Sequence, residues 1–254
     1  TNGDIYNSYL NSDRGAAFNT LMRILDEKSI SGVSEEKWQL VEFASLDNSF
    51  ALRLGAIEEL TYLIHHDRER SWLLFEKLIS GHALLLETHH VREFLHWSLY
   101  KNFLRVKPFI EKMIASTKPE VQEMGAELAC IAAISETALE SEDALTEAVI
   151  LADETIKGSN SLRRGAASVY IFNMTKGTEP HIRKLCLEKV RTLVNDEDEN
   201  IRNKIIQPFF SLGYEFFFDF RNLMEDIALS EYYPVNLQFT EYLWKHGMQD
   251  PNWT

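Results

Sequence analysis

The chain contains few residues that cross-link or interrupt a fold: two cysteines, six prolines and eleven glycines among 254 residues. Two cysteines exclude a disulfide-stabilised scaffold. Cys130 and Cys186 each lie in an apolar stretch of helical pattern, which is typical of a protein from a reducing compartment. No run of eighteen apolar residues is present, and no secretory signal opens the chain. We therefore expect a cytoplasmic protein with no membrane partner.

Disorder is excluded by composition, because hydrophobic residues make up 45% and aromatic residues 11% of the chain. No linker rich in Ser, Gly or Pro divides the sequence. We therefore predict a single domain over residues 1–254. The first residue is Thr1 rather than Met. We therefore expect the sequence to be a fragment of a larger protein.

Motifs that carry catalysis are also missing. The sequence contains no G-x-x-x-x-G-K-[ST], no H-E-x-x-H, no G-x-S-x-G and no C-x-x-C. We expect no enzyme activity within these residues and no catalytic, cofactor-binding or metal site. If a parent protein binds a nucleotide, that site lies outside this sequence.

A five-residue pattern recurs along the chain, and its last position falls at residues 15, 55, 95, 125, 165 and 205. Four of the five intervals are 40 residues and one is 30. Glycine followed by alanine occupies the last position four times, at Gly15, Gly55, Gly125 and Gly165. Because glycine inside a helix is unfavourable by itself, its recurrence predicts helices that approach closely. A period of about 40 residues is typical of repeats built from pairs of helices.

The apolar spacing and the start signals predict helices throughout. Ser34 and Ser141 are expected N-caps, Pro119 a first-turn residue, and 195–200 a loop and cap between two helices. We expect helix pairs at 12–45, 50–79, 87–115, 118–156, 160–194 and 197–229, and a terminal helix at 234–247.

Two segments near the C-terminal end depart from the plain helical pattern. Residues 214–220 could form a strand, but the flanking periodicity favours a buried helix. Pro208 is expected to kink a helix over residues 201–212.

The repeats resemble those of HEAT-repeat α-solenoids over essentially the whole chain. The sequence over 121–129 is similar to the second-helix pattern of that family, as is 162–167, and 199–202 resembles its turn. The resemblance implies an all-α, right-handed α-solenoid of about six HEAT-like helical pairs. Successive second helices of such a fold form an extended concave surface that binds other macromolecules.

A narrower resemblance concerns two segments. Residues 11–17 and 116–126 are similar to the helical C-terminal region of bacterial STAND NTPases. In that family a C-terminal solenoid senses a ligand, a central NTPase oligomerises and an N-terminal effector acts, and some members are antiviral sensors. The resemblance implies binding of a phage or other protein ligand along the concave face, with other domains of a larger chain as further partners. The alternatives are a general HEAT-repeat adaptor or scaffold, and a HEAT-like DNA glycosylase.

The net charge of −13 is unevenly distributed. Residues 117–160 carry −8, residues 161–195 carry +5 and residues 196–254 carry −7. The basic segment predicts a surface that docks an acidic partner. Its seven basic residues are the candidate partner-binding residues: Arg163, Arg164, Lys176, Arg183, Lys184, Lys189 and Arg191. The sequence leaves open the alternative that these side chains bond to the carboxylates of the flanking acidic segments.

Six of the eight histidines lie between residues 65 and 96: His65, His66, His82, His89, His90 and His96. His89, Glu93 and His96 could share one helix face and bind a metal, or the histidines could be solvated residues of helix ends. We expect solvated histidines, and a metal site stays open as the alternative.

Aromatic residues raise two further questions. So acidic a chain argues against nucleic acid as a partner, although a glycosylase would need an aromatic such as Trp72 or Trp97 beside the flipped base. The C-terminal fifth is crowded with aromatics, which predict either an exposed protein-binding patch or a dense terminal core. These aromatics are Phe209, Phe210, Tyr214, Phe216, Phe217, Phe218, Phe220, Tyr232, Tyr233, Phe239, Tyr242 and Trp244.

Overall fold

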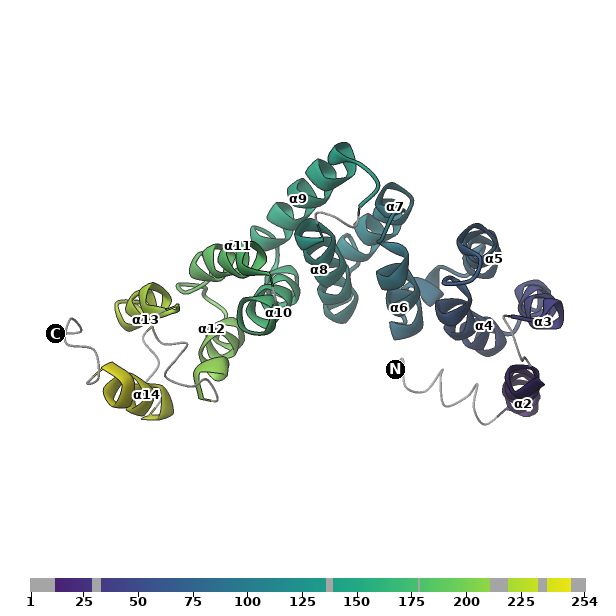
Figure 1. Ribbon diagram of the computed structural model, residues 1–254, viewed down its shortest axis with the longest axis horizontal. Coiled ribbons are helices and arrows are strands. Elements are labelled where there is room, and N and C mark those ends of the chain that lie inside the picture. The colour runs from purple at the N-terminus through teal and green to yellow at the C-terminus, as the bar shows by residue number, and fades with distance from the viewer. Residues whose placement is uncertain are drawn as a thin grey trace. The chain divides into compact units, whose positions relative to one another are not determined.

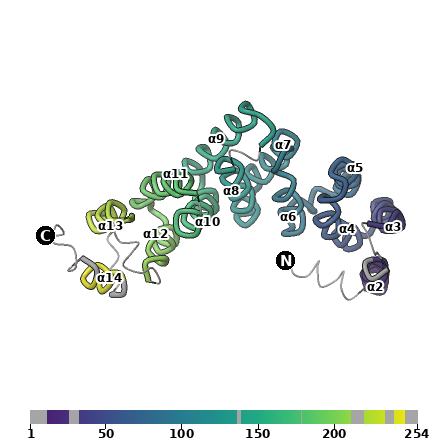
Figure 2. The backbone as a smooth tube through the Cα atoms, in the orientation of Figure 1, coloured from purple at the N-terminus to yellow at the C-terminus, as the bar shows by residue number. Residues whose placement is uncertain are grey.

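The computed structural model describes residues 12–28, 33–135, 139–177, 179–210, 219–232 and 237–247. All regular structure in these ranges is helical, and they contain no strand (Figures 1 and 2). The predicted all-α class is therefore confirmed. None of the described helices is long and apolar enough to span a bilayer.

Contacts between Cα atoms group the chain into two compact units. Unit 1 comprises Thr1–Ser116 and Ser135–Ala144, and unit 2 comprises Thr117–Ile134 and Leu145–Thr254. Each unit is described by itself below. The single domain inferred from the sequence stays a prediction.

The helices of unit 1 form two rows. Helix α4 packs against α2 and α6, and α3 packs against α5, while α2, α3, α4 and α5 each also contact the next helix along the chain. The helices of this unit are α2 (Asp13–Lys28), α3 (Glu35–Leu46), α4 (Phe50–Leu63), α5 (Arg68–Ile79), the 3-10 helix η1 (Ala83–Glu87), α6 (His89–Ser98) and α7 (Phe103–Ile114).

Unit 2 repeats this arrangement. Helix α10 packs against α8, α11 and α12, and α11 packs against α13, so alternate helices again lie side by side (Figure 1). The helices of this unit are α8 (Pro119–Ile134), most of α9 (Glu142–Ile156), α10 (Asn160–Lys176), α11 (Pro180–Arg191), α12 (Glu199–Ile206), the 3-10 helix η2 (Gln207–Phe210), α13 (Arg221–Ala228) and α14 (Leu237–Gly247).

The helices fall within the ranges expected from the sequence except for α3, which ends one residue later, and η1, which lies mainly in the expected gap after residue 79. The recurring pattern lies in the even-numbered helices from α2 to α12. Its last position is the sixth or seventh residue of α4, α6, α8, α10 and α12. In α2, by contrast, Gly15 is the third residue, so the first copy is out of register with the others.

The predicted start signals are in place. Ser34 Oγ accepts a hydrogen bond from the Lys37 amide, and Ser141 Oγ accepts one from the Ala144 amide. Helix α8 begins at Pro119, and α12 begins directly after its N-cap Asp198. Side-chain oxygens thus satisfy amides that have no partner inside the helix.

The segment around Pro208 differs from its prediction. Helix α12 ends at Ile206, and Pro208 lies in η2 rather than at a kink inside a longer α-helix. Proline lacks an amide hydrogen and clashes with the preceding turn, so the chain changes to the tighter 3-10 form there. The predicted segment 214–220 lies outside the described residues except for Asp219 and Phe220.

The sequence-predicted close approach of helices occurs between α8 and α10. A Cβ atom at Gly165 would collide with the carbonyl oxygen of Glu123 and would lie 2.9 Å from the Cβ of Ala126. These two helices therefore pack with their backbones in contact, a separation that requires glycine at position 165.

Candidate protein-binding surface

The seven basic residues proposed from the sequence separate into two groups in unit 2. Five form ion pairs with carboxylates of the two flanking acidic segments: Arg163, Arg164, Arg183, Lys189 and Arg191. The other two, Lys176 and Lys184, make no ion pair among the described residues.

Arg163 and Arg164 tie the start of α10 to the loop that precedes α12. Arg163 Nε donates to Asp196 Oδ2 at 2.7 Å, and Arg164 lies between Glu123 and Asp198, with N···O distances of 2.7 and 2.9 Å. The bonded carboxylates raise the pKa of both arginines, chiefly through Asp196 for Arg163 and Glu123 for Arg164. Both guanidinium groups are thus part of the internal packing.

The next three basic residues each reach one carboxylate of an adjoining helix or loop. Lys189 Nζ lies 2.5 Å from Asp153, and Arg191 Nε lies 2.5 Å from Asp226. Arg183 pairs with Asp219 at 3.2 Å on a more exposed part of the surface. Exposed pairs of this kind contribute little stability each, but they neutralise the charge that would attract an acidic partner.

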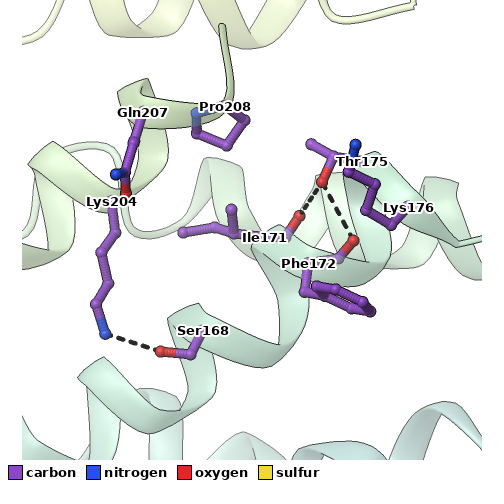
Figure 3. A pocket seen from close by; sticks show the side chains of 8 residues that line it. All are labelled: Ser168, Ile171, Phe172, Thr175, Lys176, Lys204, Gln207 and Pro208. Carbon is purple, nitrogen blue, oxygen red and sulfur yellow. Dashed lines mark hydrogen bonds between the residues drawn. The ribbon is translucent and has the colours of Figure 1, made fainter. Parts of the chain in front are cut away.

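Lys176 borders a hollow of about 370 Å³ between α10 and the α12–η2 segment, which we call the α10 groove (Figure 3). Ile171 lies between Lys204 and Lys176 in this view, and Pro208 lies across the groove from α10. The lining residues are Ser168, Ile171, Phe172, Thr175, Lys176, Lys204, Gln207 and Pro208.

The floor of the groove is apolar and its ends are basic. Phe172 is 63% exposed although it is a large aromatic residue. At one end Lys204 Nζ donates to the uncharged Ser168 Oγ at 2.8 Å, and at the other end stands Lys176. Thr175 Oγ1 bonds to backbone carbonyls of its own helix, so its methyl group is left to the groove. No carboxylate is among the lining residues.

Lys184 borders a second, smaller hollow of about 270 Å³ beside α11. Arg183 and Asp219 line the same hollow and bond to each other across it. An internal ion pair therefore already joins two of the three charged side chains there, whereas the lysines of the α10 groove meet no carboxylate among its lining residues.

The histidine region of unit 1 does not assemble a metal site. His89 lies 3.5 Å from Glu93 on the predicted shared face, whereas His90 lies 3.9 Å from Glu58 of another helix. Within the described ranges no three His, Cys, Asp or Glu side chains converge to hold a metal ion. Burial lowers the pKa of His90 and of His96, so neither of these imidazoles gains a charge readily.

The tryptophans considered for base stacking occupy different environments. Trp72 is fully buried against Phe75 and Phe94, and the guanidinium of Arg105 lies 4.9 Å from its ring centroid. Its ring is therefore closed to a ligand base. Trp97 is 39% exposed and packs edge-on against His65.

The thiols are also unsuited to surface chemistry. Cys130 and Cys186 are free and fully buried, and Cys130 Sγ lies 3.5 Å from Thr155 Oγ1. Burial raises the pKa of Cys130 to about 11 and that of Cys186 to about 12. Because the thiolate is the nucleophile, both groups are inert in the folded protein.

The C-terminal aromatics divide between core and surface. Phe209, Phe220, Phe239 and Tyr242 are buried together, whereas Phe210, Tyr232 and Trp244 are exposed. The remaining members of the predicted set, Tyr214, Phe216, Phe217, Phe218 and Tyr233, lie outside the described residues.

Of the eight residues that line the α10 groove, Lys176 alone was predicted as a binding residue from the sequence, and Phe172 and Lys204 are the most important of those missed. Phe172 resembles any apolar residue of a helical stripe, and Lys204 belongs to a segment of negative net charge. The repeat does not mark Phe172 as exposed, because the residue seven positions after the glycine is exposed at Tyr62 but buried at Ala132.

No model of a protein family matches this chain, and no curated protein or solved structure matches it.

Proposed function

We propose that the chain is a protein-binding helical-repeat domain of the HEAT-like, right-handed solenoid kind, with no catalytic role of its own. Its partner is a folded protein held against the even-numbered helices. The single observation that carries the proposal is the α10 groove, which offers an exposed aromatic and two lysine charges on that row of helices.

The spacing of the ion pairs supports the repeat interpretation. Pairs between helices repeatedly join residues about one repeat apart in sequence. Examples are Arg70 with Glu35, 35 residues apart, and Lys189 with Asp153, 36 residues apart. A chain in which each helix pair contacts mainly its neighbour has contacts of this separation, as solenoids do.

The choice of helix row follows from backbone packing. Gly165 lets α8 and α10 approach until their backbones touch, and in a stack of helix pairs such an approach would shorten the even-numbered row of unit 2. A stack whose two rows differ in spacing curves toward the closer row. The α10 groove would then lie on the concave face, the usual binding surface of such stacks.

The narrower proposal is that this domain is the ligand sensor of a bacterial STAND-type NTPase that recognises a phage protein. It rests on the sequence resemblance of residues 11–17 and 116–126. Capture of the ligand would shift the parent protein toward an oligomeric, active state. An adaptor or scaffold role remains the alternative, and the parent reading frame distinguishes the two, since only the sensor is joined to an NTPase.

A capture experiment tests the proposal at both levels. The tagged chain is used to bind proteins from phage-infected and uninfected cells, with the tag alone as control. We expect one protein, present only after infection, that co-elutes with the chain in stoichiometric amount on gel filtration. Recovery of nothing above the tag would overturn protein binding, and identical partners in both cells would overturn the sensor role only.

A further inference from the structure

We infer that the α10 groove binds an extended acidic peptide segment, with an aromatic side chain of the peptide on the groove floor and a carboxylate at each end. The inference deepens the proposed function, because it rests on the chain being a protein-binding domain. It names the site and the chemistry that the partner must present.

The charge argument begins with the ion pairs of unit 2. Arg163, Lys189 and Arg191 each contact a carboxylate of an adjacent segment. Lys204 makes the same kind of contact with α10, 36 residues away in sequence, but the residue that it meets is the hydroxyl of Ser168. The positive charge of Lys204 is therefore hydrogen-bonded without being neutralised by Ser168.

Lys176 supplies the second charge. It is exposed in the last turn of α10 and makes no ion pair among the described residues. Its positive charge also lies beside the negative, C-terminal end of the α10 helix dipole, where a cation is favourable. Two ammonium groups therefore stand at the ends of the groove in a chain whose net charge is −13, a local arrangement that selects an anionic ligand.

The floor between these charges is suited to a ring. Ile171, Phe172 and Pro208 line it, and Phe172 remains 63% exposed. A hollow of about 370 Å³ is at the lower end of the range for ligand pockets, so it accepts one or two side chains rather than a folded element. An aromatic side chain inserted there would cover Phe172 and stack on apolar neighbours.

The length of the groove sets the spacing in the peptide. Ser168, which holds Lys204, and Lys176 are eight residues apart on α10, and a helix rises about 1.5 Å per residue, which gives about 12 Å. An extended peptide covers that length in about four residues and points every second side chain to the same face. The matching pattern is acid-x-aromatic-x-acid, in which all three recognised side chains face the groove.

The test uses synthetic pentapeptides and the full chain. The probe is Asp-Ser-Phe-Ser-Asp with blocked ends, and the controls are Lys-Ser-Phe-Ser-Lys and Asp-Ser-Ser-Ser-Asp. Binding is followed by methyl NMR of Ile171 and of Leu187, which lines the second hollow. We expect saturable shifts of Ile171 with the probe, little effect at Leu187, and binding weaker by about fivefold or more for each control.

Matched variants locate the site. Lys176→Glu, Lys204→Met and Phe172→Ser should each weaken the probe, whereas Lys184→Glu and Leu229→Ser should not, because these exposed residues of unit 2 lie outside the groove. Lys204→Met leaves Lys176 in place at the C-terminal end of α10. It therefore still tests the groove if Lys176→Glu destabilises that helix. Circular dichroism confirms that each variant is folded.

Several outcomes would overturn the inference. The first is that the charge-reversed peptide binds as tightly as the probe. The second is that Lys184→Glu weakens probe binding as much as Lys176→Glu does. The third is that free phenylacetate binds as tightly as the probe, which would make the groove a small-molecule site. The inference about the groove and the proposed function can fail independently of each other. Protein capture that survives Lys176→Glu and Phe172→Ser would discard the groove alone, and probe binding in a chain that captures no protein would discard protein recognition alone.

Discussion

Gly165 lies directly against the backbone of Glu123, close enough that a methyl group at position 165 would collide with the Glu123 carbonyl oxygen. The contact joins α8 to α10 one repeat apart. A backbone carbonyl cannot move aside as a flexible side chain does, so the two helices would have to separate to admit any other residue.

Substitutions at Gly165 should therefore destabilise unit 2 in order of size. Gly165→Ala gains about 1 kcal/mol of helix propensity but introduces the collision, and overpacking of a close contact costs about 1–3 kcal/mol. We expect a small net loss for alanine and a larger one for Gly165→Val, measured by urea unfolding. Lys184→Ala, on the exposed side of α11, is the control. A Gly165→Val protein as stable as the wild type would contradict the close packing.

Arg53 should be far more important for stability than its charge suggests. Its side chain is 7% exposed and donates to the carbonyls of Asp47, Lys77 and Leu78 at 2.6–3.0 Å. Removing it leaves one buried and two partly buried carbonyls without this partner, and an unsatisfied buried group costs about 1–3 kcal/mol. We expect Arg53→Met to lower the free energy of unfolding of unit 1 by about 3 kcal/mol or more.

Arg14 provides a matched control in the same unit. Its side chain is 73% exposed and pairs with the Asp47 carboxylate at 3.2 Å. An exposed pair contributes about 0–1 kcal/mol, so Arg14→Met should be nearly neutral in the same urea titration. Equal effects of the two substitutions would show that the three carbonyl contacts of Arg53 do not stabilise the fold.

Asp198 should make unit 2 sensitive to acid. Burial by itself would raise the pKa of Asp198, but hydrogen bonds from the Asn200 amide and side chain and from Arg164 outweigh it, so the pKa is lowered. A folded-state pKa below the unfolded value of about 3.9 stabilises the protein above that pH. This contribution is lost as the pH falls from about 4 through the folded-state pKa.

Asp198→Asn tests this dependence. We expect the variant to be less stable than the wild type by about 1–2 kcal/mol at pH 7 and the difference to shrink in urea titrations below about pH 4. Glu188→Gln, an exposed change in the same unit, should leave the pH profile unaltered. A difference that stays constant down to pH 3 would mean that Asp198 acts through packing rather than charge.

The two thiols should report the opening of unit 2. With its pKa raised to about 11 in the folded protein, Cys130 is almost entirely protonated at pH 8. Together with complete burial, this should slow reaction with a disulfide reagent by about a hundredfold or more relative to the unfolded chain. Lys184→Cys, which adds an exposed thiol, should react at once, and rapid reaction of both native thiols would contradict the burial.

The repeat could be predicted from the sequence because the small residue that produces it recurs at the same position of successive helices. Close packing demands a small residue, and the register that produced Gly55, Gly125 and Gly165 also placed the helices in their predicted ranges. The conformation at Pro208 was harder to predict, because the residues that pack against the turn decide whether a proline kinks a helix or ends it in a 3-10 turn.

The candidate site could be predicted only in part from the sequence. Charge counting identified Lys176 together with six other basic residues, but five of the seven pair with carboxylates of other helices or loops about one repeat away. Sequence alone could not say which of them are paired. Phe172 likewise shares the apolar pattern of buried neighbours such as Met174, and only the packing of α12 shows that it is exposed.

The ion pairs that bridge one repeat also bear on mechanics. If the helix pairs of each unit stack as proposed, a pulling force on the chain passes through them in series, and the links between neighbours, such as Arg70 with Glu35, are broken one step at a time. A released step of about 35 residues frees about 120 Å of extended chain while the other steps keep their own contacts. We expect such a unit to lengthen under load like a spring, in increments of one repeat, and to rewind when the load is removed.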